Sequence, residues 1–549
     1  MLTPEKIASP CKNFCFLSAA PFRDPRDGRE KVACVTFANY AGGALLLVDP
    51  AADTAESYHL PQDEGAWALY NDRDRALILG TCSRFGCVHR FDLASRSFSE
   101  PVRTETETYI WNFADGHDGC LYGGTYPGCR LVRYDLDGHT LTDLGRVSPN
   151  EKNLYSRTAA YYDGHILVTV GMDRGSRWAY RLSDGKFFED DGTMGFPPQE
   201  KLLAFEDPRL GEGMSCPCAL ERAGLFAVWG QEYVYWADAD AAPVIRRFPC
   251  DAPPTSIMTL AADERGVLWG ACTFGMTLFS YDPATGRAWN SPALTATGGG
   301  EAYAIVFAGG KLYTTAYAGG WHIEYDPEKP WDQRAGENPR VLGVCAPAYI
   351  RPEAGSVLGP DGCVWTGWLA AYGTYGGAIS RVRPETGEVT VYPVGDRGVG
   401  AIAAGSRAVF YATTGAGNGL PTLPGPFSLC AVDGECRELG RAVLADAPRS
   451  LVVSDGTVFC ALPDRVALFD ETALAPAGSI PVSGCTKLLA SRKHGVLAFT
   501  ESGTVYALSA AEKRAEPAGS APAGVRAVCE AADGIYCAKT VELWRLDER

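Results

Sequence analysis

Residues 256–290, SIMTLAADERGVLWGACTFGMTLFSYDPATGRAWN, decide the fold because they form the clearest copy of a unit that recurs along the chain. Two apolar, β-rich runs (SIMTLAA and GVLWGA), an alternating run (TLFSYD) and a short closing run (RAW) predict four strands, with ADERG and DPATG as turns. Four strands of this length bury little surface alone, so the unit must stack against copies of itself. Such stacking is typical of a β-propeller blade.

The residue that opens the second strand marks each copy of this unit. It recurs at Gly28, Arg75, Gly119, Gly164, Gly224, Gly266, Gly310, Gly362, Arg407, Gly456, Gly495 and Gly534. The intervals run from 39 to 60 residues, and a four-stranded blade needs about 40–45. The chain is therefore predicted to be all-β, with about twelve four-stranded blade units and loop insertions where the interval is longer.

Twelve blades in one ring would leave a wide central hole that side chains could not fill, so the sequence favours two consecutive β-propellers. The stretch 326–349 is rich in proline and polar residues and is predicted to be a linker. We therefore expect propellers over residues 1–345 and 346–549, with seven plus five blades; six plus six is the alternative. A spare strand near the start and a missing one at the end predict that one terminus completes a blade begun by the other.

Composition excludes several classes of protein. With 46% hydrophobic and 21% charged residues, the chain of 549 residues has the composition of a folded protein. A net charge of −16 argues against nucleic acid or an anionic membrane as the main partner. The first residues, MLTPEKIASPCKNF, lack the basic start and apolar core of a signal peptide, which predicts a cytoplasmic protein. The oligomeric state does not follow from the sequence.

Many of the nineteen cysteines lie inside predicted strands, where a reduced thiol packs as a small hydrophobic residue. The pairs Cys11/Cys15 and Cys216/Cys218 lack the paired CxxC spacing of a zinc site. Neither a metal nor another cofactor is therefore expected.

The loops that join the second and third strands should converge around the central channel of a propeller, where ligands bind. These loops and the starts of the inner strands contain many Arg, Tyr and Trp residues. Arginine pairs with carboxylates and aromatic rings stack on sugars, so an anionic oligosaccharide or other small-molecule ligand is expected. The predicted substrate-binding residues are Arg84, Arg130, Arg157, Arg174, Arg177, Trp111, Tyr155, Trp321 and Tyr372. Ordinary turn and packing roles are the alternative for each.

Three residues are predicted to be catalytic: His322, Tyr317 and Tyr126. His322 follows GGW at a loop edge, close in sequence to Tyr317, and a histidine can accept a proton at neutral pH. A packing role for this histidine remains the alternative.

The segments GGTYPGCRLVRYDLDG, GACTFGMTLFSYDPATG, TTAYAGGWHIEYDP and GWLAAYGTYGGAISRVRPETG resemble blades of the streptogramin-lyase-like and related bacterial propellers. That superfamily also resembles the seven-bladed polysaccharide lyases that act on uronic acids. The resemblance implies a β-propeller and, by analogy, a carbohydrate lyase. Its motifs are structural, and no lyase active-site motif matches, so no catalytic residue is carried over.

The preferred function is an enzyme that cleaves uronate-containing oligosaccharides by β-elimination. This reaction needs a cation on the carboxylate, a base for the neighbouring C–H and an acid for the leaving oxygen. One alternative is a non-catalytic propeller that binds a glycan or a protein. Another is a glycoside hydrolase, which needs two carboxylates facing the channel, whereas Asp173 is the only acidic residue in these loops.

Overall fold

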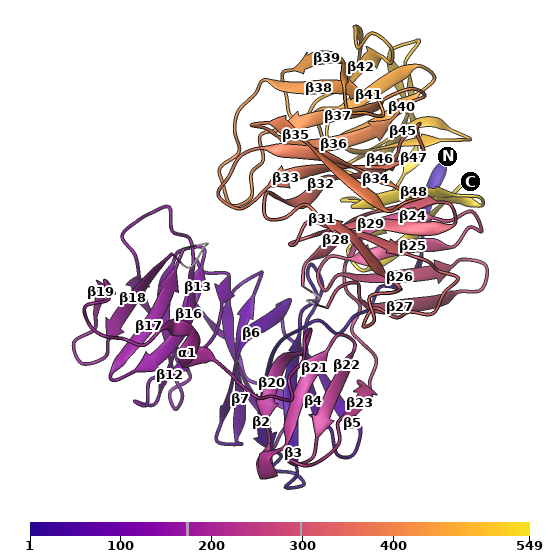
Figure 1. The fold of residues 1–549 in the computed structure, drawn as a ribbon. Helices are drawn as coiled ribbons and strands as arrows, with labels where there is room; N and C mark the ends of the chain where they lie inside the picture. The colour runs from indigo at the N-terminus through magenta and orange to yellow at the C-terminus, as the bar shows by residue number, and fades with distance from the viewer. Residues whose placement is uncertain (172–174, 297–298, 549) are drawn as a thin grey trace. The chain divides into compact units, whose positions relative to one another are not determined.

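The computed structural model describes residues 1–171, 175–296 and 299–548. β-strands are the main regular structure of these residues, and helix is almost absent among them (Figure 1). The strands form eight four-stranded sheets, one eight-stranded sheet and one ten-stranded sheet, consistent with blade units. Within the described residues, no helix is long and apolar enough to cross a membrane.

The chain divides into two compact units, which are described separately. Unit 1 comprises residues 1–13 and 254–549, and unit 2 comprises residues 14–253. This division differs from the predicted boundary at residues 345/346, which falls inside unit 1. The expected linker contains β31 (Arg340–Val344), whose residues pair with those of β30 (Trp321–Tyr325) as the last strand of a sheet. Proline and polar residues there lie in the loop before this edge strand.

The described residues of unit 2 form five successive groups of strands and two short helices. The strands are β2 (Phe16–Arg23), β3 (Glu30–Thr36), β4 (Ala44–Asp49) and β5 (Thr54–His59); β6 (Gly65–Asp72), β7 (Ala76–Cys82), β8 (Cys87–Asp92), β9 (Ser97–Phe98) and β10 (Val102–Arg103); β11 (Tyr109–Ile110), β12 (Ala114–Asp115), β13 (Cys120–Tyr126), β14 (Arg130–Asp135) and β15 (Thr140–Arg146); β16 (Ser156–Tyr162), β17 (His165–Val170), β18 (Ser176–Arg181) and β19 (Lys186–Glu189); and β20 (Ser215–Ala219), β21 (Leu225–Trp229), β22 (Glu232–Trp236) and β23 (Val244–Arg247). The helices are α1 (Gln199–Leu203), inside the predicted insertion, and a 3₁₀ turn over Glu221–Ala223.

Unit 1 contains seven groups of strands. They are β24 (Ile257–Ala262), β25 (Leu268–Cys272), β26 (Thr277–Asp282) and β27 (Arg287–Ala293); β28 (Glu301–Ala308), β29 (Lys311–Tyr317), β30 and β31; β32 (Tyr349–Leu358), β33 (Val364–Ala370), β34 (Gly377–Arg383) and β35 (Glu388–Gly395); β36 (Gly398–Ala404), β37 (Val409–Thr414), β38 (Phe427–Val432) and β39 (Glu438–Leu444); β40 (Ser450–Ser454), β41 (Thr457–Ala461), β42 (Val466–Asp470) and β43 (Pro476–Ile480); β44 (Cys485–Ser491), β45 (Gly495–Thr500), β46 (Thr504–Ser509) and β47 (Arg514–Ser520); and β48 (Ala527–Ala531), β49 (Gly534–Lys539) and β50 (Glu542–Glu548) with β1 (Leu2–Ala8).

The two ends of the chain share the last of these sheets. β1 pairs antiparallel with β50, from Leu2 opposite Glu548 to Ala8 opposite Leu543. This pairing gives β48, β49 and β50 a fourth strand, as the sequence predicted for the termini. It also places residues 1–13 in unit 1, although residues 14–253 separate them from the rest of that unit.

The first strands of the sheets lie side by side. In unit 1, β28 packs against β24 and β32, and the same contact repeats through β36, β40, β44 and β48, with β48 also against β24. In unit 2, β2 packs against β6 and β20, and β16 packs against β13 and α1. Residues on the first strands of neighbouring sheets are therefore close in space even when they are far apart in sequence.

Strand burial explains why the repeat is visible in the sequence. Each of the twelve stretches predicted to be a second strand is a strand, and such strands carry apolar residues on both faces because sheets cover both. β41 is buried along nearly its whole length, whereas most of β43, the last strand of the same sheet, is exposed. The last strands are therefore more polar and harder to recognise.

The hydrophobic core of each unit lies between neighbouring sheets. In unit 1, Phe410 and Leu429 of one sheet pack with Val458 of the next. In unit 2, Phe226 of β21 packs with Val32 and Leu46 of the β2–β5 sheet. The nineteen cysteines all lie in the described residues and form no disulfide bond, and most are buried within these layers.

Candidate functional site

The predicted site residues fall in both units. His322, Tyr317, Trp321 and Tyr372 belong to unit 1, and the others belong to unit 2. The predicted residues are therefore divided between the two units. Arg174 and Asp173 lie outside the described residues.

In unit 2 the structure brings several predicted residues together in an aromatic cluster, made up of Trp67, Tyr109, Trp111, Tyr126, Tyr155 and Arg157. Trp111 stacks on Tyr109 with ring centroids 4.9 Å apart, and the ring centroids of Tyr126 and Tyr155 are 4.5 Å apart. The guanidinium carbon of Arg157 lies 4.7 Å from the centre of the Trp111 ring. All these side chains are partly exposed, so flat apolar faces and one cation remain near solvent.

The other described arginines predicted for binding in unit 2 are engaged by acidic groups of the protein. Arg130 Nε donates to Asp143 Oδ2 over 2.5 Å, and Arg177 Nε donates to Asp190 Oδ2 over 2.6 Å. Arg84 forms a longer ion pair, 3.5 Å, with Glu64. These carboxylates already neutralise the guanidinium groups of Arg84, Arg130 and Arg177.

His322 lies in the core of unit 1, not at a loop edge open to ligand. Its side chain is 1% exposed, its Nε2 lies 3.0 Å from Ser380 Oγ, and its ring packs against Trp368. Burial lowers the pKa of His322 to about 3. A neutral imidazole with no route to solvent cannot exchange a proton with substrate, so this predicted catalytic residue is a packing residue.

Trp321 is also a packing residue in large part. It begins β30 and packs against the hydrophobic layer between the β24–β27 and β28–β31 sheets. Gly319, two residues before Trp321, lies directly against the indole ring and has no room for a side chain. The GGW motif therefore serves close packing at the end of this hairpin.

Tyr317 and Tyr372 are in contact in unit 1. They lie beside Arg351, which is not among the predicted site residues. Their hydroxyl groups hydrogen-bond to each other, and the guanidinium carbon of Arg351 lies 3.9 Å from the centre of the Tyr317 ring. Arg351 Nη1 donates to Tyr303 Oη over 2.6 Å, and its Nε donates to Asn418 Oδ1 over 2.8 Å. The guanidinium is thus held in one orientation from several sides.

Further charged side chains complete this charged cluster, whose members are Glu301, Tyr303, Tyr317, Arg351, Glu353, Tyr372, Lys487 and Arg526. Most come from first strands of the sheets, β28, β32 and β44, and Arg526 directly precedes β48. Burial raises the pKa of Glu301 to about 7, against the opposing charges of Arg351 and Arg526. Burial and the neighbouring Arg526 lower the pKa of Lys487. Groups with pKa values shifted by burial and by nearby charges are often found at functional sites.

A glycine fixes the approach of Glu301 to Tyr317. Gly300 has a φ of +103°, and a Cβ atom at this position would collide with the Tyr317 carbonyl. Only glycine combines this backbone conformation with such close contact. The first residue of β28 therefore lies directly beside the end of β29.

The predicted site residues do not include most of this charged cluster. They come mainly from loops, whereas most members of the cluster lie on first strands. Glu301, Arg351 and Lys487 interrupt strands that are otherwise rich in apolar or small residues. Charges inside such strands are costly unless they are paired or face a solvated space. That interruption is the signal that could have indicated these residues.

Comparison with known proteins does not assign the chain to a family. No protein-family model matches the chain, and no curated protein matches it. One solved structure that it resembles is the extracellular domain of a protein named as a one-component system, from B. thetaiotaomicron. The sequence identity is 12%, the match covers 90% of this chain and 69% of the other, and the TM-score is 0.33.

Proposed function

We propose that the protein is a carbohydrate-active enzyme that cleaves uronate-containing oligosaccharides by β-elimination, with the charged cluster of unit 1 as its reaction centre. The observation that carries the proposal is the position of Arg351, held by Tyr303 and Asn418 and stacked on Tyr317. An oriented guanidinium fork suits the carboxylate of a uronate.

The underlying architecture that we propose is a pair of β-propellers, seven-bladed in unit 1 and five-bladed in unit 2. Single residue pairs join the two halves of the larger sheets: Leu2 with Gly519 and Tyr109 with Cys82. Dividing the sheets at these pairs leaves twelve groups, ten of four strands and two of five strands, with seven of the twelve in unit 1. The contacts of the first strands in unit 1, from β24 round to β48, support a ring with the charged cluster on its inner strands.

The residues of the cluster fit the three roles that the reaction needs. Arg351 would neutralise the carboxylate and stabilise the charge that develops when the neighbouring C–H loses its proton. Lys487, whose pKa is lowered by burial, would accept that proton. Glu301, with a pKa of about 7, would donate a proton to the leaving oxygen as the C–O bond breaks and a C=C bond forms.

The test is incubation with oligosaccharides of galacturonate, glucuronate and mannuronate, monitored by the ultraviolet absorbance of an unsaturated product. We expect turnover on at least one of them, and its loss in Arg351→Ala. Absence of product across all three classes would contradict the lyase proposal. Arg441→Ala is a matched control, because Arg441 pairs with Glu438 on an outer strand of the same unit.

A non-catalytic glycan-binding role is the second candidate, and the aromatic cluster of unit 2 favours it. Its stacked rings and Arg157 offer apolar faces and a cation. Calorimetry with the same oligosaccharides distinguishes the two candidates, since a pure binder gives heat of binding and no product.

A glycoside hydrolase is a third candidate, because Glu301 and Glu353 are two carboxylic groups close enough to influence each other. A protonated acid beside an ionised carboxylate is the pair that such enzymes use. Saturated reducing ends among the products would support this chemistry, and unsaturated ends would support the lyase. The absence of a nucleic-acid or membrane partner and the cytoplasmic location remain predictions.

A further inference from the structure

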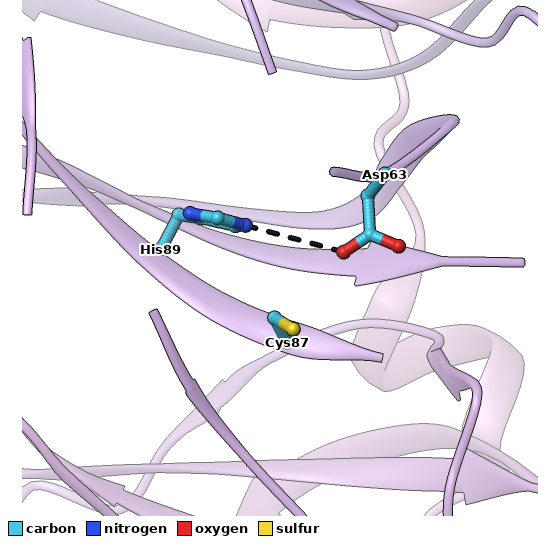
Figure 2. Close-up of side chains that lie close together, drawn as sticks. All are labelled: Asp63, Cys87 and His89. Carbon is cyan, nitrogen blue, oxygen red and sulfur yellow. Dashed lines mark ion pairs between the residues drawn. The ribbon is translucent and has the colours of Figure 1, made fainter. Parts of the chain in front are cut away.

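Three buried side chains of unit 2 meet at the end of the β6–β9 sheet (Figure 2). Asp63 precedes β6, and Cys87 and His89 lie two residues apart on β8. Their exposed fractions are 1%, 1% and 0%. One carboxylate oxygen, the thiol sulfur and one imidazole nitrogen all lie within 4.8 Å of one another.

His89 is the unusual member of this group. Neither of its ring nitrogens has a hydrogen-bond partner, although the side chain is fully buried. Its Nε2 points toward Asp63 Oδ2 at 3.9 Å, which is too long for a hydrogen bond (Figure 2). Buried polar groups in proteins are nearly always bonded, so this imidazole needs an explanation.

Two neighbouring sheets give an internal comparison, because a threonine hydroxyl fixes the register of the third strand in all three. In each sheet this hydroxyl accepts a hydrogen bond from the backbone N–H that opens the third strand. The equivalent pairs are Thr36 with Ala44, Thr81 with Cys87, and Thr125 with Arg130.

The residue two positions further on each third strand can therefore be compared directly. His89 corresponds to Leu46 in the preceding sheet and to Val132 in the following one. Both are buried hydrophobic residues. The fold thus places an aliphatic side chain at this position in the neighbouring sheets, and packing alone does not require a histidine.

Asp63 has a structural role of its own. It accepts hydrogen bonds from Thr81 Oγ1 at 2.5 Å and from the backbone N–H of Phe85. Glu107 does the same in the next sheet, accepting from Thr125 Oγ1 at 2.6 Å. The carboxylate therefore belongs to the repeat, whereas Cys87 and His89 are additions found in this sheet.

We propose that Asp63, Cys87 and His89 bind a divalent transition-metal ion of the zinc class. Nitrogen, sulfur and carboxylate oxygen are the ligands that zinc takes, at about 2.0–2.3 Å. Tetrahedral ligand atoms at such distances lie roughly 3.3–3.8 Å apart, so the three side chains would draw together from their present positions. The thiol would release its proton when the ion binds.

The burial of the three residues assigns the ion a structural role. Leu77, Leu79 and Phe91 of the same sheet form the hydrophobic layer against the β2–β5 sheet. An ion beside this layer would tie the residues before β6 to β8. This proposal is independent of the lyase activity proposed for unit 1.

The first test is metal binding by the full-length protein after dialysis against a chelator. We expect one equivalent of added Zn²⁺ to be retained, with a rise in melting temperature. Co²⁺ in place of Zn²⁺ should give the near-ultraviolet absorption of a thiolate–cobalt bond. Failure of the wild-type protein to retain Zn²⁺ and to show this absorption would overturn the proposal.

The variants follow from the neighbouring sheet: Cys87→Ala and His89→Leu introduce the residues found at the equivalent positions Ala44 and Leu46. Both should fold, bind Zn²⁺ at least about 10-fold more weakly, and lose the shift in melting temperature. Cys34→Ala, a buried cysteine of β3 outside the cluster, should bind Zn²⁺ like wild type. Equal Zn²⁺ binding by Cys87→Ala, His89→Leu and wild type would overturn the proposal even if the protein binds zinc elsewhere.

Discussion

The two units use the same kind of four-stranded sheet but place different chemistry on their first strands. Unit 2 presents stacked aromatic rings with Arg157, and its predicted rim arginines Arg84, Arg130 and Arg177 are paired with carboxylates. Unit 1 presents Arg351 together with Glu301 and Lys487, whose pKa values are shifted by burial. In both units the sheet sets the positions of the side chains, and a few first-strand residues set the chemical groups that those positions offer.

The largest expected effect is a loss of stability confined to one of the two hydrophobic cores. Phe410→Ala should lower the free energy of unfolding of unit 1 by about 3–5 kcal/mol, because a fully buried phenylalanine leaves a cavity. Hydrogen exchange followed by mass spectrometry should show faster exchange in peptides of unit 1. Phe226→Ala is the matched change in unit 2. Equal acceleration in both units by either variant would contradict the division into two cores.

A second prediction contrasts the two arginines. Arg351→Ala should lower kcat on a uronate substrate by about 100-fold or more, the usual loss when one group that stabilises developing charge is removed. Arg157→Ala should raise KM or weaken binding without a comparable loss of kcat. Steady-state kinetics of both variants measures the contrast. If Arg157→Ala reduces kcat more than Arg351→Ala, the reaction centre lies in unit 2.

A third prediction concerns the aromatic cluster alone. Trp111→Ala removes the ring that contacts both Tyr109 and Arg157 and should weaken glycan binding about 10-fold, or about 1.4 kcal/mol. Isothermal calorimetry gives the affinity directly. Trp544→Ala, at the last sheet of unit 1, serves as the control. Unchanged affinity in Trp111→Ala would assign this cluster to packing.

A fourth prediction concerns a pH dependence of stability that comes from Glu301 in unit 1. The folded-state pKa of Glu301, about 7, lies above the usual value of about 4.3. Its contribution to stability is therefore fully present below about pH 4.3 and is lost as the pH rises through 7. Glu301→Gln should flatten the fall in unfolding free energy between pH 5 and 8, measured by urea unfolding. The same slope in the variant would show that another group is responsible.

The sequence predicted the strands well because their cause is local. The run VLWGAC at residues 267–272 is apolar, rich in β-forming residues and bounded by turn residues, and β25 lies there as expected. The division into units was predicted less well, because it depends on which sheets pack together. The stretch 326–349 looks polar and irregular, yet it ends in β31, whereas the chain passes between units at residues 13/14 and 253/254.

The aromatic cluster of unit 2 was predicted in part, because its residues are brought together by the repeat. Trp111, Tyr126, Tyr155 and Arg157 meet because first strands and their neighbouring loops lie side by side, which the repeat implies. Arg351 could not be assigned in the same way. The pairing of β32 with β33 shifts register on both sides of Arg351, and such irregularities change the face that a side chain occupies without a clear trace in the sequence.

The pairing of β1 with β50 has a consequence for synthesis on the ribosome. The partner of β1 is made more than five hundred residues later, so unit 1 cannot acquire this sheet until β50 has been synthesised. Unit 2 emerges as one continuous segment and is free to fold earlier. Its folding would bring the flanking residues Lys12 and Pro254 to their bridge, which shortens the effective loop between the nascent N-terminal strand and the remainder of unit 1.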